Sequence, residues 1–112
     1  MKRISFDGKA MRAVFTDPNG VINEQTIFYF QQIGNLITAK YAGGKVKTGF
    51  LIGKLENDKL KFHYTQMHDD ESLNGGHSVC EIEITNDGRI KLTEHFEWAS
   101  GEKGVNVIEE IG

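Results

Sequence analysis

The sequence has a single cysteine, Cys80, and a single proline, Pro18, among its 112 residues. One cysteine excludes a disulfide within the chain and argues against a zinc site built from thiolates. Because free thiols are typical of reducing compartments, we expect a cytoplasmic protein. The N-terminal residues 1–15 lack the apolar run of a signal peptide, and no stretch approaches the roughly 18 consecutive apolar residues of a membrane-spanning helix. We therefore expect no membrane partner.

The chain also lacks an excess of positive charge. Thirteen Lys and Arg residues face sixteen Asp and Glu residues, which gives a net charge of −3 and leaves no basic block to neutralise phosphates. Aromatic and basic residues do not alternate in a patch of the kind that binds single strands. We therefore expect no nucleic-acid partner. The length and the 38% hydrophobic content are typical of one globular domain over residues 1–112.

Helical periodicity is missing as well, and a period of two takes its place. Apolar and polar residues alternate in segments that end at turn signals, of which Asp17-Pro18-Asn19-Gly20 is the strongest. The predicted strands cover residues 9–16, 26–33, 36–42, 45–55, 59–67, 77–85, 89–99 and 105–111. The polar stretch 68–76 is longer than a hairpin needs, and it is expected to form a rim loop.

Short turns between consecutive strands indicate an antiparallel up-and-down meander. The right-handed twist of about eight strands allows such a meander to close by pairing its last strand with its first, which removes exposed edges. Two-residue connections favour neighbouring strands over the crossings of a sandwich. The sequence therefore predicts an all-β fold, a single small barrel in which the first and last strands pair.

One face of almost every predicted strand is apolar, and this face is expected to line the interior. The predicted inner residues are Phe28, Phe30, Ile37, Ala39, Tyr41, Phe50, Ile52, Phe62, Tyr64, Gln66, Ser78, Cys80, Ile82, Ile84, Ile90, Leu92, Glu94, Phe96 and Trp98. The strand 9–16 places Met11, Ala13 and Phe15 on one side. The opposite faces carry Lys, Glu, Thr and His residues, as a solvated wall requires.

Polar groups on the apolar face are the most informative feature, above all Glu94 between Leu92 and Phe96. An unpaired buried carboxylate is costly, so it requires hydroxyl, amide or cationic partners. Two interpretations stay open: a ligand pocket in the barrel mouth, or a structural network near the barrel end, including a glutamate at an open rim. The candidate ligand-binding residues are Tyr41, Tyr64, Gln66, Glu94 and Trp98.

Other chemically active residues favour structural roles. The four histidines show no metal-ligand spacing, so no metal site is expected. Cys80 alternates with apolar residues and is interpreted as a core residue rather than a nucleophile. Gly49 and Gly53 lie within a predicted strand and are expected to mark bulges or bends. No helix follows a Gly-rich segment to form a phosphate site, and no cofactor is expected.

The segments 41–53 (YAGGKVKTGFLIG), 62–66 (FHYTQ), 88–94 (GRIKLTE) and 108–111 (IEEI), with Trp98-x-Ser100-Gly101, resemble a family of short bacterial proteins. The resemblance covers most of the chain and implies a calycin-like barrel similar to avidins, lipocalins and fatty-acid-binding proteins. Members often carry the name N-acetylglutamate synthase. Acetyltransferases of the usual fold bind acetyl-CoA through a Gly-rich strand-to-helix turn, which this sequence lacks, so we do not expect that activity.

Three functions follow, from different classes. The first is a non-enzymatic barrel that binds a small molecule in its mouth. The second is a structural or interaction protein with a filled core, which would include a homodimer formed through one barrel wall. The third is an enzyme that uses Glu94 as a general acid or base, which we rank last because no partner group is placed by sequence.

Overall fold

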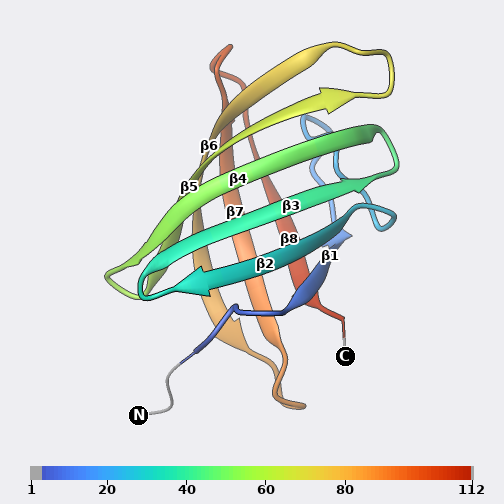
Figure 1. Ribbon diagram of the computed structural model, residues 1–112. Helices are drawn as coiled ribbons and strands as arrows, with labels where there is room; N and C mark the ends of the chain where they lie inside the picture. The colour runs from blue at the N-terminus through green and yellow to red at the C-terminus, as the bar shows by residue number, and fades with distance from the viewer. Residues whose placement is uncertain (1–3, 112) are drawn as a thin grey trace.

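The computed structural model describes residues 4–111 and forms a closed antiparallel barrel in which each strand pairs with the next (Figure 1). The strands are β1 (Ala10–Phe15), β2 (Ile27–Ile33), β3 (Leu36–Gly43), β4 (Val46–Glu56), β5 (Lys59–His68), β6 (Leu73–Ile84), β7 (Ile90–Trp98) and β8 (Lys103–Glu110). β1 pairs with β8, where Ala13 lies opposite Ile108. The predicted all-β meander and its closure are confirmed.

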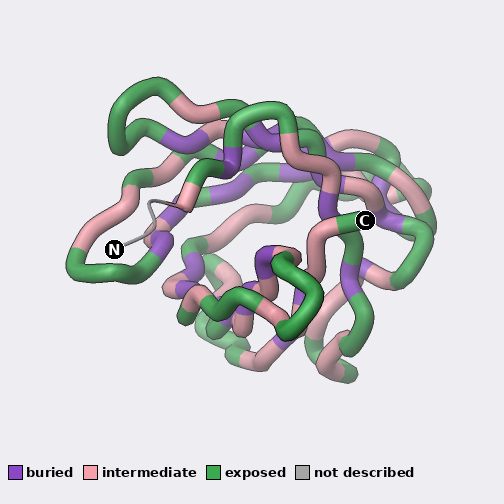
Figure 2. Tube along the Cα trace, turned by 90° about the horizontal axis from the view of Figure 1, so that it is seen from below, coloured by how far each residue is buried: buried purple, intermediate pink, exposed green. Residues whose placement is uncertain are grey.

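Buried and exposed residues alternate along most strands, and Figure 2 shows this alternation around the whole tube. In antiparallel pairs, directly opposite residues share a face, so inner residues oppose inner residues. Phe30 lies opposite Ala39, and Ala39 opposite Leu51. The inner side chains of all eight strands therefore pack into one core.

The predicted facing of β4 is wrong. Phe50 is 53% exposed and Ile52 is 58% exposed, whereas Leu51 is buried. The register shifts between Val46 and Thr48, so the buried set of β4 becomes Gly49 and Leu51. A shift of one residue exchanges the two faces of a strand, and both faces of β4 carry apolar residues, so alternation alone could not decide.

Smaller corrections apply at three strand ends. Phe15 is 56% exposed because a register shift between Ala13 and Phe15 moves it off the inner face of β1. Ile84, the last residue of β6, is 50% exposed, where the sequence predicted an inner position. The predicted rim loop 68–76 is shorter than expected, because β6 begins at Leu73 and pairs with Met67.

The two barrel ends are closed by different segments. At one end, the segment before β1 inserts Phe6, which is fully buried and lies against Phe30 with ring centroids 5.5 Å apart. At the other end, residues 16–26 connect β1 to β2 and place the buried Ile22 over the interior. No helix within residues 4–111 is long and apolar enough to cross a membrane. The second end holds the polar groups that the sequence singled out.

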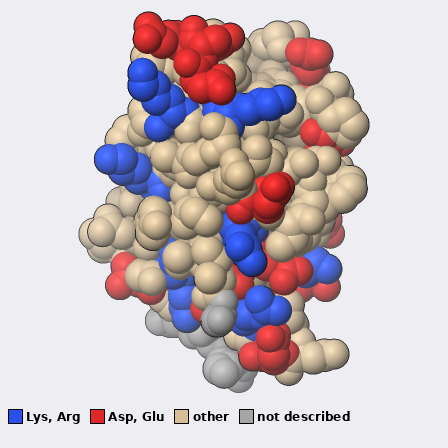
Figure 3. Space-filling view, turned by 90° about the vertical axis from the view of Figure 1, so that its right-hand side faces the viewer, with Lys and Arg blue, Asp and Glu red and all other residues tan. Residues whose placement is uncertain are grey.

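Lys and Arg side chains are interspersed with Asp and Glu side chains on the face drawn in Figure 3. Several of these charges pair across neighbouring strands, such as Lys103 with Glu97 at 3.9 Å. Such exposed pairs contribute little to stability and are screened by salt. Both signs of charge are therefore present on this face of the barrel.

A candidate ligand pocket at one end of the barrel

A cavity lies inside the barrel beneath the segment that joins β1 to β2. Its lining comprises Gly20, Val21, Ile22, Phe28, Tyr41, Leu51, Phe62, Tyr64, Gln66, Glu94, Phe96, Trp98 and Asn106. The empty space among them totals about 320 Å³, but the centre of a water molecule can reach only about 20 Å³ of it. That space holds about one or two waters. All five candidate residues from the sequence, Tyr41, Tyr64, Gln66, Glu94 and Trp98, line this one cavity, where β3, β5 and β7 bring them together.

Glu94 is the most unusual of these residues, because its carboxyl group is almost fully buried on the inner face of β7. Its Oε2 accepts a hydrogen bond from Ser78 Oγ at 2.7 Å, and its Oε1 accepts one from Asn106 Nδ2 at 3.1 Å. Burial raises the pKa of Glu94 above its ordinary value, although the bonds from Ser78 and Asn106 act in the opposite direction. Both donors are neutral, so they satisfy the oxygens without supplying a positive charge.

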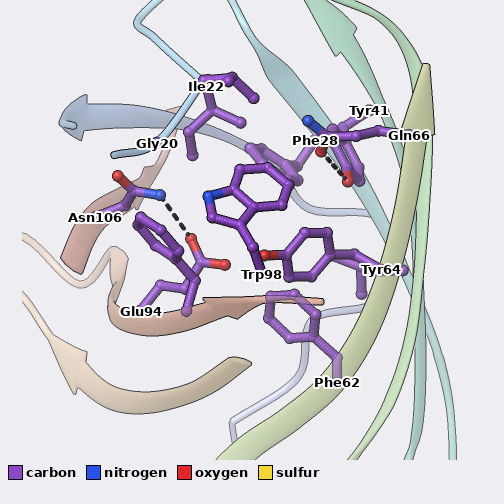
Figure 4. A pocket seen from close by; sticks show the side chains of 13 residues that line it. Gly20, Ile22, Phe28, Tyr41, Phe62, Tyr64, Gln66, Glu94, Trp98 and Asn106 are labelled. Carbon is purple, nitrogen blue, oxygen red and sulfur yellow. Dashed lines mark hydrogen bonds between the residues drawn. The ribbon is translucent and has the colours of Figure 1, made fainter. Parts of the chain in front are cut away.

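Tyr64 has a buried hydroxyl group with no hydrogen-bond partner among residues 4–111. Figure 4 shows this hydroxyl directed toward the carboxyl group of Glu94. Burial, and secondarily the negative charge of Glu94, raises the pKa of Tyr64 well above its ordinary value of 10.0, so the phenol stays neutral. Buried polar groups in folded proteins nearly always have a partner. The hydroxyl is thus an open hydrogen-bonding position in the cavity wall.

Tyr41 and Gln66 form a separate, satisfied pair. Tyr41 Oη donates to Gln66 Oε1 at 2.7 Å, and Gln66 Nε2 lies 2.8 Å from His68 Nε2. Because an amide nitrogen only donates, the His68 nitrogen accepts in this arrangement. Burial raises the pKa of Tyr41 as well. This pair fixes the side chains at the β3 and β5 wall and leaves no free group there.

Trp98 occupies the centre of the pocket. Figure 4 shows its indole with Ile22 and Phe28 on one side and Glu94 and Tyr64 on the other. The Nε1–H group donates to the backbone carbonyl of Asn19 at 2.8 Å, which ties the ring to the segment joining β1 and β2. A ligand larger than a water molecule or two therefore needs Trp98 or this segment to move.

Asn106 is a site residue that the sequence prediction missed. It lies opposite Glu94 on β8, and its Oδ1 accepts from the backbone N–H of Asp17 at 3.0 Å. Asp17 in turn accepts from the N–H groups of Asn19 and Val105, which lowers its pKa. The signal is present, because Asn106 is the polar residue between Val105 and Val107. Apolar and polar residues do not alternate regularly over residues 105–111, so the sequence alone does not assign the inner face of this strand.

Two glycines give the tyrosines their space. A Cβ atom on Gly49 would lie 2.5 Å from Tyr41 Cζ, and one on Gly76 would lie 2.7 Å from Tyr64 Oη. Gly49 pairs with Tyr41 in regular register, and Gly53 pairs with Ile37. A bulge at Gly49 or Gly53 is therefore wrong, whereas a bend at these positions stays a prediction. Close approach of a neighbouring residue is a reason for glycine there.

The remaining candidates lie away from the cavity lining. Cys80 is fully buried as a free thiol, which confirms its core position, and burial raises its pKa well above its ordinary value. His63, His77 and His95 are exposed on the outer wall, where His95 Nε2 lies 2.8 Å from Glu81 Oε1. Across residues 4–111, no three His, Cys, Asp or Glu side chains gather in a way that would hold a metal ion.

The sequence model of a family described as "Avidin-like protein" matches residues 4–111. This range includes all eight strands and every residue that lines the cavity. No curated protein and no solved structure matches the chain at a significant level.

Proposed function

Because the chain belongs to the avidin-like family, we propose that it is a non-enzymatic barrel that binds a small molecule in the Trp98 pocket. Small-ligand binding is typical of that family. The observation that carries the proposal is the unpartnered hydroxyl of Tyr64, buried and directed toward Glu94. No group of residues 4–111 satisfies this hydroxyl, and an unmade buried hydrogen bond costs about 1–3 kcal/mol. A ligand with a matching polar group would recover that cost.

The shape of the pocket supports the same proposal. An apolar cavity with a few convergent polar groups is the usual form of a small-molecule site. The bound molecule replaces part of the volume that Trp98 fills, so binding includes movement of Trp98 or of the segment beside Asn19. We assign no catalytic role to Glu94, because Ser78 and Asn106 hold its two oxygens in place.

Native mass spectrometry of gently purified protein tests this proposal. We expect a retained small molecule on wild-type protein and on the outer-wall variant Phe50→Ser, whose side chain lies outside the barrel. We expect its loss from Glu94→Leu, provided that circular dichroism shows a cooperative melt for that variant. A clean apo mass for wild-type protein, or retention that is equal in Glu94→Leu, would remove the pocket proposal.

A second candidate function is a homodimer formed through the outer wall of β2, β3 and β4. Tyr29, Phe50 and Ile52 are all more than half exposed on this wall, and Lys40 Nζ lies 5.8 Å from the Phe50 ring centroid. Exposed apolar side chains gathered on one wall are typical of interaction surfaces. Gel filtration at two concentrations tests it: Phe50→Ser should shift a dimer to monomer, while Leu73→Ser, exposed elsewhere, should not.

A further inference from the structure

The charge balance around Glu94 is incomplete. Glu94 is 6% exposed, and both hydrogen-bond donors to its carboxyl group, Ser78 and Asn106, are neutral. Among residues 4–111, no Lys, Arg or His nitrogen lies within ion-pair distance of it. The nearest basic residue in sequence, His95, points to the outer wall and pairs with Glu81. A buried carboxylate is stabilised by a cationic partner, and residues 4–111 do not provide one.

The walls around this carboxyl group are aromatic. The Trp98 ring packs edge-to-face against Tyr64, with centroids 5.4 Å apart and planes at 76°, and against Phe96 at 5.9 Å and 66°. Phe62 packs edge-to-face against Tyr64 at 6.0 Å. These aromatic side chains line the same cavity as Glu94. The face of an aromatic ring attracts a cation through the ring quadrupole, most strongly for tryptophan.

The hydroxyl of Tyr64 is a free hydrogen-bond acceptor beside this carboxyl group. Its oxygen accepts hydrogen bonds as well as donating one, and it has no partner among the described residues. Figure 4 shows it and the Glu94 carboxyl group directed toward the same space beside Trp98. An ammonium group placed there would donate one N–H to the carboxylate and another to the phenol oxygen. A carboxylate and a free acceptor thus converge on one space that aromatic side chains border.

We propose that the ligand is a protonated primary or secondary amine whose ammonium group binds between Glu94 and Tyr64, within the rings of Trp98, Phe96 and Phe62. This inference rests on the proposed function and specifies its ligand class. The ammonium supplies the positive charge that Glu94 lacks, and the alkyl or aryl part of the amine lies against the apolar lining. Neutral ligands are the alternative that the experiment must separate from this one.

The test uses butylammonium chloride as the probe and 1-butanol as a neutral compound of nearly the same shape. Trp98 is the only tryptophan in the chain, so its fluorescence reports binding directly. We expect saturable binding of butylammonium at about millimolar concentration, as for a fragment of this size, and no saturable change with 1-butanol at matched ionic strength. Tetramethylammonium, which has no N–H group, should bind less tightly than butylammonium.

Three variants locate the interaction. Glu94→Gln should weaken butylammonium binding by about 30-fold or more, the loss expected when one partner of a buried charge pair is removed. Glu97→Gln is the matched control, because this residue pairs with His77 and Lys103 on the outer wall of the same strand. Tyr64→Phe should weaken butylammonium by about 10-fold and leave tetramethylammonium unchanged, since only the former donates to the phenol oxygen.

The outcomes separate this inference from the proposed function. If 1-butanol binds as well as butylammonium, or if Glu94→Gln binds butylammonium normally, the amine assignment is wrong. The same holds if native mass spectrometry finds a retained molecule without a basic nitrogen, a result that would leave the pocket proposal standing. If no probe binds and wild-type protein retains nothing, both proposals fail together.

Discussion

Single residues in this barrel differ in how completely their polar atoms are paired, and the two inner tyrosines are the clearest case. Tyr41 donates to Gln66, whereas the Tyr64 hydroxyl has no partner among residues 4–111. Tyr41→Phe should therefore lower the free energy of unfolding by about 1 kcal/mol, and Tyr64→Phe should leave it unchanged or raise it by up to about 1 kcal/mol. Urea denaturation of both variants measures the difference. An equal loss in both would mean that Tyr64 is satisfied in solution by a bound water.

Glu94 makes stability depend on pH in the direction opposite to most carboxylates. Burial raises the pKa of Glu94 in the folded protein above its ordinary value of 4.5, which the unfolded chain keeps. At a pH between these two pKa values, Glu94 carries a proton in the folded protein and has released it in the unfolded chain. The free energy of unfolding should then fall as pH rises through this window. Urea denaturation between pH 4.5 and neutrality should show this fall in wild-type protein and a flatter profile in Glu94→Gln.

Other carboxylates cannot produce the same profile. Hydrogen bonds lower the pKa values of Asp17, Glu56 and Asp70. What these carboxylates contribute to the free energy of unfolding is therefore lost only as the pH falls below their ordinary pKa values. Glu56→Gln therefore serves as the control and should change the profile on the acid side alone. Identical profiles for wild-type protein and Glu94→Gln would contradict the buried position of this carboxyl group.

At the scale of elements, the sequence was most informative for strands with one polar and one apolar face. β7 alternates Leu92, Glu94 and Phe96 with charged or hydroxyl residues, so its inner face could be predicted from the period of two alone. β4 has apolar residues on both faces, and its inner glycines, Gly49 among them, carry no hydrophobic signal. Its facing depends on a register shift and on the ring of Tyr41, which only the three-dimensional structure provides.

The site was predictable to a similar degree. Five lining residues lie on strands whose alternation was clear, and all five reach the cavity. Gly20, Val21 and Ile22 belong to the connection between β1 and β2, where no periodicity indicates which side chain turns inward. Asn106 enters the site only because β8 pairs with β7 in the register that places it opposite Glu94. Register across strands is not visible from either strand alone.

The connection between β1 and β2 is predicted to control access to the pocket. Asp17 holds it by accepting from the N–H groups of Asn19 and Val105, and Asn19 in turn holds Trp98. Asp17→Ala should release the segment, so the Trp98 emission should shift to the red and acrylamide should quench it more strongly. Asp87→Ala, which removes a similar carboxylate from the turn between β6 and β7, should have neither effect. An unchanged Trp98 spectrum in Asp17→Ala would show that the segment is held by other contacts.

For the whole molecule, closure of the barrel determines where a site can lie. Pairing of β1 with β8 leaves no open sheet edge, so recognition uses either the interior or the outer wall. Phe6 fills one end of the barrel. The other end holds the buried carboxyl group of Glu94 beside the side chain of Trp98. Small-molecule binding is therefore expected at a single end of the barrel. The outer wall of β2, β3 and β4 is expected to take no part in binding this ligand.

A ¹⁵N NMR titration tests this placement most directly, with the small-molecule fraction that acid releases from gently purified protein as the titrant. We predict that the largest chemical-shift changes fall on the Trp98 indole N–H and on the backbone of residues beside Tyr64, Glu94 and Asn106. Phe50 and Ile52 should stay unshifted. Chemical-shift changes confined to the outer wall, with the Trp98 indole signal unchanged, would contradict binding in the Trp98 pocket.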